Sequence, residues 1–131
     1  MSTAVRYYSR SGNTKAVADA IAQSLGVPAI SVDQPDAQLT ETTDVLFIGG
    51  ALYAYGLDNH LKAYLKTLKK DSVKKAVVFS TSWISKHSID LIKKALADAG
   101  IPVEDESFYV KNQPSDAQKE EAAAFAKKFV G

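Results

Sequence analysis

The stretch that decides the fold is Ser9-Arg10-Ser11-Gly12-Asn13-Thr14, which stands between an apolar strand-like run and an amphipathic helical run. Residues 4–8 before it have the pattern of a β-strand. After it, apolar residues recur at helical spacing from Val17 to Leu25, and Gly26 stands where a helix C-cap belongs. A strand that turns tightly into a helix leaves backbone N–H groups unpaired at the helix N-terminus. The stretch therefore predicts a strand–loop–helix unit with an anion site at its loop.

Phosphate is the anion expected at this loop. The unpaired N–H groups and the positive end of the helix dipole both attract it. Ser9, Ser11 and Thr14 add hydroxyl donors, and Gly12 lets the backbone approach an anion without a side chain in the way. We therefore expect the loop to bind a ligand that carries a phosphate, and the remaining chain to decide which ligand.

Strands and helices alternate along the rest of the chain. Residues 44–50 begin with Asp44 and then form a continuous apolar run, which is typical of a central parallel strand buried on both faces. Ser115 and Gln118 have the spacing of a helix capping box, and Ser85 or Ser88 is the expected cap of the preceding helix. The expected strands are residues 4–8, 29–32, 44–50, 75–81 and 103–110, the last interrupted by acidic residues 104–106. The expected helices have apolar faces at residues 17–25, 57–68, 89–99 and 122–129, and residues 35–43 form a loop with room for one helical turn.

Five strands alternating with helices predict an α/β fold with a doubly wound parallel sheet and helices on both faces. The 131 residues, 46% of them hydrophobic, are enough for one core, so we expect a single domain over residues 1–131. Ligands of such sheets bind at the carboxyl ends of the strands, near the switch in strand order. Three loops, residues 9–14, 49–58 and 80–87, are therefore expected at one edge.

Composition narrows the functional classes. Sixteen Lys and Arg against fifteen Asp and Glu give a net charge of +1, which argues against general binding to nucleic acid or to a membrane surface. The absence of cysteine excludes disulfides, thiolate chemistry and cysteine-ligated metals. No charged-then-apolar leader precedes the first strand, and no apolar run approaches the ~20 residues of a membrane span. We therefore expect a cytoplasmic protein with no membrane span.

Aromatic residues follow two of the predicted strand ends. The second loop contains Tyr53 and Tyr55, and the third contains Trp83. A tyrosine on one side and Trp83 on the other would sandwich a flat ring, and such stacking contributes about 0.5–1.5 kcal/mol beyond buried area. The alternative interpretation is that these aromatics only cover the core. Together with the phosphate loop, they favour a mononucleotide with a planar head.

Other phosphate-binding classes lack their residues here. A dinucleotide fold needs Gly-x-Gly-x-x-Gly, of which only Gly12 is present, and the P-loop motif is absent. A phosphorylatable receiver domain carries clustered acids where this chain has Ser9 and Gly49, and a tyrosine phosphatase needs a cysteine. No set of His, Asp and Glu has metal-site spacing. His60 and His87 are interpreted as surface histidines without a role.

In the three loops at the expected sheet edge, the chain resembles the flavodoxins, and specifically the short-chain flavodoxin-like proteins. The resemblance rests on residues 8–14, which are similar to the family's hydroxyl-x-hydroxyl-Gly-x-Thr phosphate loop, on residues 48–53 and on the loop near Trp83. It implies a flavodoxin-like fold with non-covalent FMN at the sheet edge. It also implies electron transfer to and from redox partner proteins.

The resemblance implies a set of cofactor-binding residues and no catalytic residue or metal ligand. The Tyr55–Gly56 peptide is the candidate group that reorients to hydrogen-bond N5 of the reduced flavin. The phosphate is expected at Ser9, Arg10, Ser11, Gly12, Asn13 and Thr14. The remaining FMN contacts are expected at Ala51, Leu52, Tyr53, Ala54, Tyr55, Gly56, Ser80, Thr81, Ser82 and Trp83.

Two features leave alternatives open. Flavodoxins that act as low-potential carriers are typically acidic, whereas this chain is near neutral and has a lysine cluster at Lys62, Lys66, Lys69, Lys70, Lys74 and Lys75. The cluster is either a solvated surface or a docking patch for an acidic partner. Residues 48–56 also resemble the corresponding loop of flavodoxin-like protoporphyrinogen oxidases. A small FMN-dependent quinone or protoporphyrinogen oxidoreductase is therefore one alternative, and a flavin-free binding domain on the same fold is another.

Overall fold

A parallel five-stranded sheet forms the centre of the molecule. The computed structural model describes residues 2–53, 56–82 and 86–130. The strands lie in the order β2-β1-β3-β6-β7, and every neighbouring pair is parallel. Their bounds are β1 Thr3–Tyr7, β2 Ala29–Ser31, β3 Val45–Gly50, β6 Ala76–Thr81 and β7 Val103–Val110.

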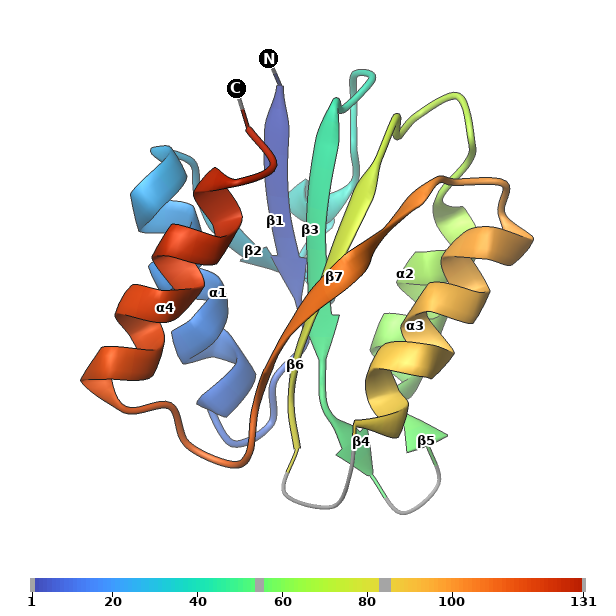
Figure 1. The fold of residues 1–131 in the computed structure, drawn as a ribbon. Coiled ribbons are helices and arrows are strands. Elements are labelled where there is room, and N and C mark those ends of the chain that lie inside the picture. Colours follow the sequence, from blue (N-terminus) through green and yellow to red (C-terminus); the bar gives the residue numbers. More distant parts are fainter. Residues whose placement is uncertain (1, 54–55, 83–85, 131) are drawn as a thin grey trace.

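Helices cover both faces of this sheet, as Figure 1 shows. Helices α1 (Asn13–Leu25) and α4 (Asp116–Lys127) pack on one face, and α2 (Asn59–Thr67) and α3 (His87–Asp98) pack on the other. The predicted doubly wound α/β fold is confirmed. In the part of the chain that the structure describes, no helix combines the length and apolarity needed to cross a membrane.

Strands β3 and β6, in the middle of the sheet, are buried along their whole length. Successive side chains of a strand point to opposite faces, so Phe47 packs under α1 and α4 while Ile48 packs under α2 and α3. Gly49 is required for the close packing of β3 against β6, because a Cβ there would lie 2.3 Å from the Phe79 ring and 2.6 Å from its carbonyl oxygen. The apolar part of the segment predicted at 44–50, residues 45–50, thus forms a strand buried on both faces, as predicted.

The acidic segment of the last strand forms a bulge. Ala76 pairs with Val103 but Val78 pairs with Ser107, so β7 carries extra residues between these two pairs. The predicted interruption is therefore an irregularity within one continuous edge strand, where a bulge is tolerated. Lys75 and Lys128 pair with Glu104 and Glu106 at this bulge.

The predicted capping box of α4 is confirmed. Ser115 Oγ accepts a hydrogen bond from the Gln118 N–H, and Gln118 Oε1 accepts one from the Ser115 N–H. The prediction that Ser88 caps α3 is wrong, because Ser88 lies inside the first turn and its buried hydroxyl bonds Ser80 Oγ at 2.5 Å. The alternative cap, Ser85, lies outside the described residues.

Two short elements complete the chain. A single turn of 3-10 helix, Pro35–Ala37, corresponds to the helical turn expected in the loop after β2. The second element was not predicted: β4 (Leu52–Tyr53) and β5 (Gly56–Leu57) pair antiparallel directly after β3. This β4–β5 hairpin projects beyond the edge of the main sheet (Figure 1).

Candidate functional site

A pocket of about 360 Å³ lies at the carboxyl ends of the parallel strands. Its position agrees with the rule that ligands bind where the strand order reverses, which here is between β1 and β3. A volume above about 300 Å³ is typical of sites for small organic ligands. The lining residues are Ser9, Arg10, Ser11, Asn13, Thr14, Ala51, Leu52, Tyr53, Thr81, Ser82 and Asn112.

The first loop is shaped by its own hydroxyl groups. Ser9 Oγ accepts a hydrogen bond from the Gly12 N–H at 2.9 Å, and Ser11 Oγ accepts one from the Asn13 N–H at 3.4 Å. Gly12 has a φ of 93° and no atom lies within 4 Å of the position of a Cβ, so the need for glycine is conformational and not steric. The loop therefore places the N-terminus of α1 at the pocket.

Thr14 connects the first loop to the third. Its side chain is 1% exposed, and its Oγ1 lies 2.6 Å from Thr81 Oγ1 at the end of β6. Because a hydroxyl both donates and accepts, this contact leaves each oxygen with further bonding capacity. The start of α1 and the end of β6 are therefore held together at the pocket wall.

Arg10 reaches away from its own loop toward the second loop. Its Nε and Nη2 donate to Asp58 Oδ2 at 3.0 and 2.5 Å, and its guanidinium lies 4.0 Å from the centre of the Tyr53 ring. Burial raises the pKa of the Tyr53 hydroxyl, and the positive Arg10 offsets part of that rise. Arg10 therefore connects the first loop to the aromatic wall of the pocket.

Asp58 anchors this connection at the start of α2. Its side chain is 5% exposed, and its carboxylate accepts a hydrogen bond from the His60 N–H at 2.7 Å, as an N-cap does. Burial alone would raise the pKa of this carboxyl, but hydrogen bonds from the His60 N–H and ring together with the positive Arg10 lower it overall. The carboxylate therefore stays ionised beside the pocket.

His60 is exposed, as expected, but it is not without contacts. Its Nδ1 lies 2.9 Å from Asp58 Oδ1, and its ring stacks on Tyr8 with centroids 4.8 Å apart. Neither Asp58 nor His60 was expected to have a role from the sequence. The signal for Asp58 was available, because an aspartate directly before an apolar helical run is a typical N-cap.

A fourth loop, after β7, also contributes to the pocket and was missed. Asn13 Nδ2 donates to Asn112 Oδ1 at 3.2 Å, and Asn112 has a φ of 68°. The available signal was the turn-forming composition of residues 111–114, in which asparagine tolerates the left-handed region. The start of the third loop is fixed to the same strand, since Ser82 N–H donates to Val110 O and the Tyr109 hydroxyl donates to Ser82 O.

The structure brings ten of the sixteen expected cofactor-binding residues together in the pocket lining. Gly12 shapes the loop but does not line the pocket, and Gly56 lies in β5. Ser80 is fully buried and donates to Gly50 O, away from the pocket. Ala54, Tyr55 and Trp83 lie outside the described residues. Within the described ranges, no group of three or more His, Asp or Glu side chains is placed to hold a metal ion.

The sequence matches a known family over most of its length. A family model described as a flavodoxin domain matches residues 4–120. The chain belongs to this flavodoxin family. No curated protein sequence gives a significant match to the chain.

Solved structures of flavodoxins share the fold of this flavodoxin-domain chain. Oxidised flavodoxin 1 from Bacillus cereus is 24% identical with a TM-score of 0.82, covering 99% of this chain and 97% of that one. The two-electron reduced Megasphaera elsdenii flavodoxin is 23% identical with a TM-score of 0.69, covering 95% and 98%. The larger rubredoxin oxygen:oxidoreductase of Desulfovibrio gigas is 18% identical with a TM-score of 0.85, covering 98% of this chain and 35% of that one.

Proposed function

We propose that this flavodoxin-domain protein binds FMN non-covalently and carries electrons between partner proteins. The observation that supports it most directly is one pocket with the N-terminus of α1 at one end and Tyr53 at the other. Among the described lining residues Arg10 is the only one with a formal charge, so no carboxylate opposes an anion there. The oxidised and two-electron reduced states of the similar Bacillus cereus and Megasphaera elsdenii flavodoxins support a redox role.

The residues of the pocket fit the two ends of FMN. The hydroxyls of Ser9 and Ser11 accept hydrogen bonds within the loop and can still donate, and together with the N-terminus of α1 they suit the phosphate. Thr81 and Asn112 hold Thr14 and Asn13 in place. The half-buried apolar surface of residues 51–53 suits the ring. Bound FMN would supply reversible electron uptake, which the protein adjusts through stacking, hydrogen bonds and charge.

Arg10 takes a different role in this proposal from the one expected from the sequence. Its guanidinium bonds Asp58 and lies over Tyr53, so we assign it to positioning the aromatic wall and not to holding the phosphate. The planar guanidinium suits both contacts, because it donates in a fixed fork and stacks on aromatic faces.

A titration with FMN and riboflavin tests the proposed cofactor. The purified protein of residues 1–131 should quench the fluorescence of FMN at one FMN per chain and bind riboflavin more weakly, because riboflavin lacks the phosphate that residues 9–14 are expected to hold. Stepwise reduction of the loaded protein should then change the flavin spectrum reversibly. Protein that takes up neither ligand would overturn the proposal and favour a flavin-free binding domain.

Steady-state kinetics distinguish a carrier from an enzyme. A carrier should accept electrons from a reduced partner or dye but show no sustained oxidation of a nicotinamide or reduction of a quinone by itself. Sustained turnover of either substrate by the isolated, FMN-loaded protein would contradict the carrier proposal and favour the oxidoreductase alternative.

A further inference from the structure

A second cavity lies between α2 and α3, on the face of the sheet away from α1 and α4. It measures about 560 Å³ and is larger than the pocket at the strand ends. Its apolar walls come from both helices and from β5, and we call it the α2–α3 groove. Those walls are Leu57, Leu65, Leu68, Leu91, Ala95 and Ala99. A concave apolar surface of this kind marks an interaction site more often than a scattered surface leucine does.

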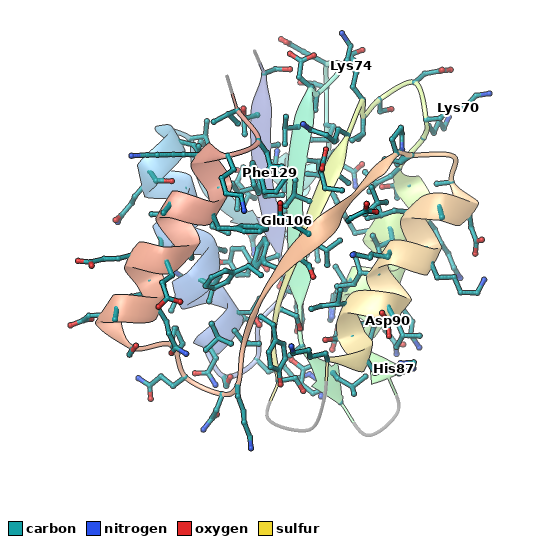
Figure 2. The ribbon with its side chains drawn as sticks, viewed as in Figure 1. Lys70, Lys74, His87, Asp90, Glu106 and Phe129 are labelled. Carbon is teal, nitrogen blue, oxygen red and sulfur yellow. The ribbon has the colours of Figure 1, made fainter. Side chains whose placement is uncertain are left out.

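Unpaired lysines border this groove on its α2 side. Lys62 and Lys66 line it and are four residues apart, which places them on the same side of the helix. Lys69 and Lys70 follow, and Figure 2 shows Lys70 pointing away from the body of the molecule. Among the described residues, none of these four lysines has an ion pair or a side-chain hydrogen bond.

The rest of the lysine cluster belongs to the fold. Lys74 pairs with Asp44 and Lys75 pairs with Glu104, so both charges are already compensated. On the α3 side of the groove, Asp98 pairs with Lys94. The lysine cluster is therefore divided: Lys62 and Lys66 on α2 line the apolar groove with uncompensated charge, and Lys69 and Lys70 follow the end of that helix.

The groove and the pocket share one wall. Leu52 and Tyr53 of β4 line the pocket, whereas Gly56 and Leu57 of β5 line the groove. The two strands are paired as Leu52 with Leu57 and Tyr53 with Gly56. A molecule that occupies the groove therefore contacts the hairpin that forms the aromatic side of the pocket.

We propose that the α2–α3 groove docks an acidic amphipathic segment of a partner protein. Its apolar side chains enter the groove, and its carboxylates pair with Lys62 and Lys66. Complementary charge steers and orients such an encounter, and apolar burial holds it. An anionic membrane fits less well, because the apolar walls lie inside a concave groove between two helices, which a flat bilayer surface does not enter.

Amide chemical shifts of the isotope-labelled protein, residues 1–131, test the proposal. The probe is a synthetic helical peptide with a leucine stripe flanked by glutamates, and its control has glutamine in place of every glutamate. The glutamate peptide should shift amides of residues 57–68 and 91–99 in a saturable manner, bind more tightly than its control, and weaken as salt is added. Shifts confined to another face, or equal binding of the two peptides, would overturn the proposal.

Two matched pairs of variants test the groove itself. Lys62→Gln with Lys66→Gln should weaken binding about fivefold, as expected for two exposed ion pairs. Lys119→Gln with Lys127→Gln removes the same charge on α4, on the opposite face of the sheet from the groove, and should leave binding unchanged. Ala95→Glu places a carboxylate in the groove and should abolish binding, whereas Ala97→Glu adds the same charge at an exposed position of α3 that does not line the groove. Equal effects within either pair would overturn the proposal.

The experiments distinguish a failure of the docking proposal from a failure of the FMN proposal. FMN affinity measured on the same variants reports whether each is folded, since none of the substituted residues lines the pocket. Peptide binding without FMN uptake would overturn the proposed function and support the docking surface. Lysine-dependent binding to vesicles of phosphatidylcholine and phosphatidylserine, with no response to the peptide, would overturn the docking proposal in favour of a membrane surface.

Discussion

Two side chains of the first loop, Thr14 and Arg10, act on different parts of the pocket. Thr14 is buried at the start of α1, and Arg10 extends to Asp58 and covers Tyr53. Because one lies at the helix N-terminus and the other at the aromatic wall, substitutions there should separate phosphate binding from ring binding. FMN and riboflavin differ only in the phosphate and so distinguish the two effects.

Thr14→Val should weaken FMN binding about tenfold or more, the usual cost of losing a hydrogen bond to a charged group. Riboflavin binding should change little, because valine keeps the volume of threonine and removes only the hydroxyl. Fluorescence titration with both ligands measures the ratio of the two affinities.

Thr81→Val is the matched control for this variant. It breaks the same buried contact, 2.6 Å between the two hydroxyl oxygens, but it keeps the hydroxyl of Thr14. Both variants should lose some folding stability, and only Thr14→Val should lose the preference for FMN over riboflavin. Equal losses of FMN and riboflavin affinity in Thr14→Val would contradict a role at the phosphate.

Arg10→Gln should weaken FMN and riboflavin binding by the same factor, about fivefold, the scale of a partly exposed ion pair and a cation–π contact. The reason is that Tyr53 loses its cation–π contact with Arg10, and the second loop loses the hydrogen bonds between Asp58 and Arg10 that hold it to the first loop. Arg10→Lys keeps a charge for Asp58 but not the planar stacking, so it should lie between wild type and Arg10→Gln. A loss confined to FMN would instead place Arg10 at the phosphate.

At the scale of elements, helix α2 begins at a buried carboxylate whose ionisation stabilises it. The pKa of Asp58 is lowered, since the His60 hydrogen bonds and the positive Arg10 outweigh the effect of burial. A lowered pKa in the folded state means that the contribution to stability is complete above the ordinary value of 3.8 and is lost as pH falls through the lowered value. The start of α2 should therefore weaken in acid.

Asp58→Asn should lower the free energy of unfolding by about 1 kcal/mol at neutral pH, because asparagine can still cap the helix but lacks the charge that strengthens the hydrogen bonds from Arg10 and His60. The difference from wild type should shrink as pH falls below 3.8, where the wild-type carboxyl becomes protonated as well. Urea unfolding of both proteins at several pH values measures this difference in the free energy of unfolding. Asp98→Asn removes the same charge at an exposed ion pair and should cost little. A difference that stays constant with pH would contradict this account.

Elements that depend on local patterns were predictable, and elements that depend on distant partners were not. The capping box at Ser115 is complete within four residues, so the sequence shows it. Ser88 has the composition of a cap, but its hydroxyl instead bonds Ser80 on a neighbouring strand. The β4–β5 hairpin and the bulge in β7 likewise depend on pairing registers, which hydrophobic spacing does not encode.

At the scale of the whole molecule, the pocket is assembled from four strand ends. The sequence predicted that the loops after β1, β3 and β6 meet, because parallel strands share one carboxyl edge. It did not predict that the loop after β7 joins them, since the Asn13–Asn112 contact spans 99 residues and depends on the strand order. Asp58 could have been predicted as the N-cap of α2 from its position, but its contact with the pocket could not, because that contact depends on the distant arginine that reaches it.

A pocket built from distant parts of the chain exists only when the whole sheet is folded, so FMN should stabilise the molecule globally. At free FMN about a hundredfold above its Kd, the free energy of unfolding should rise by about 2.7 kcal/mol. Urea unfolding at increasing FMN concentrations measures this rise, and Thr14→Val should need correspondingly more FMN for the same gain. If FMN binds by titration but leaves the unfolding free energy unchanged, the ligand does not depend on the assembled pocket, and the site proposed at the strand ends would be wrong.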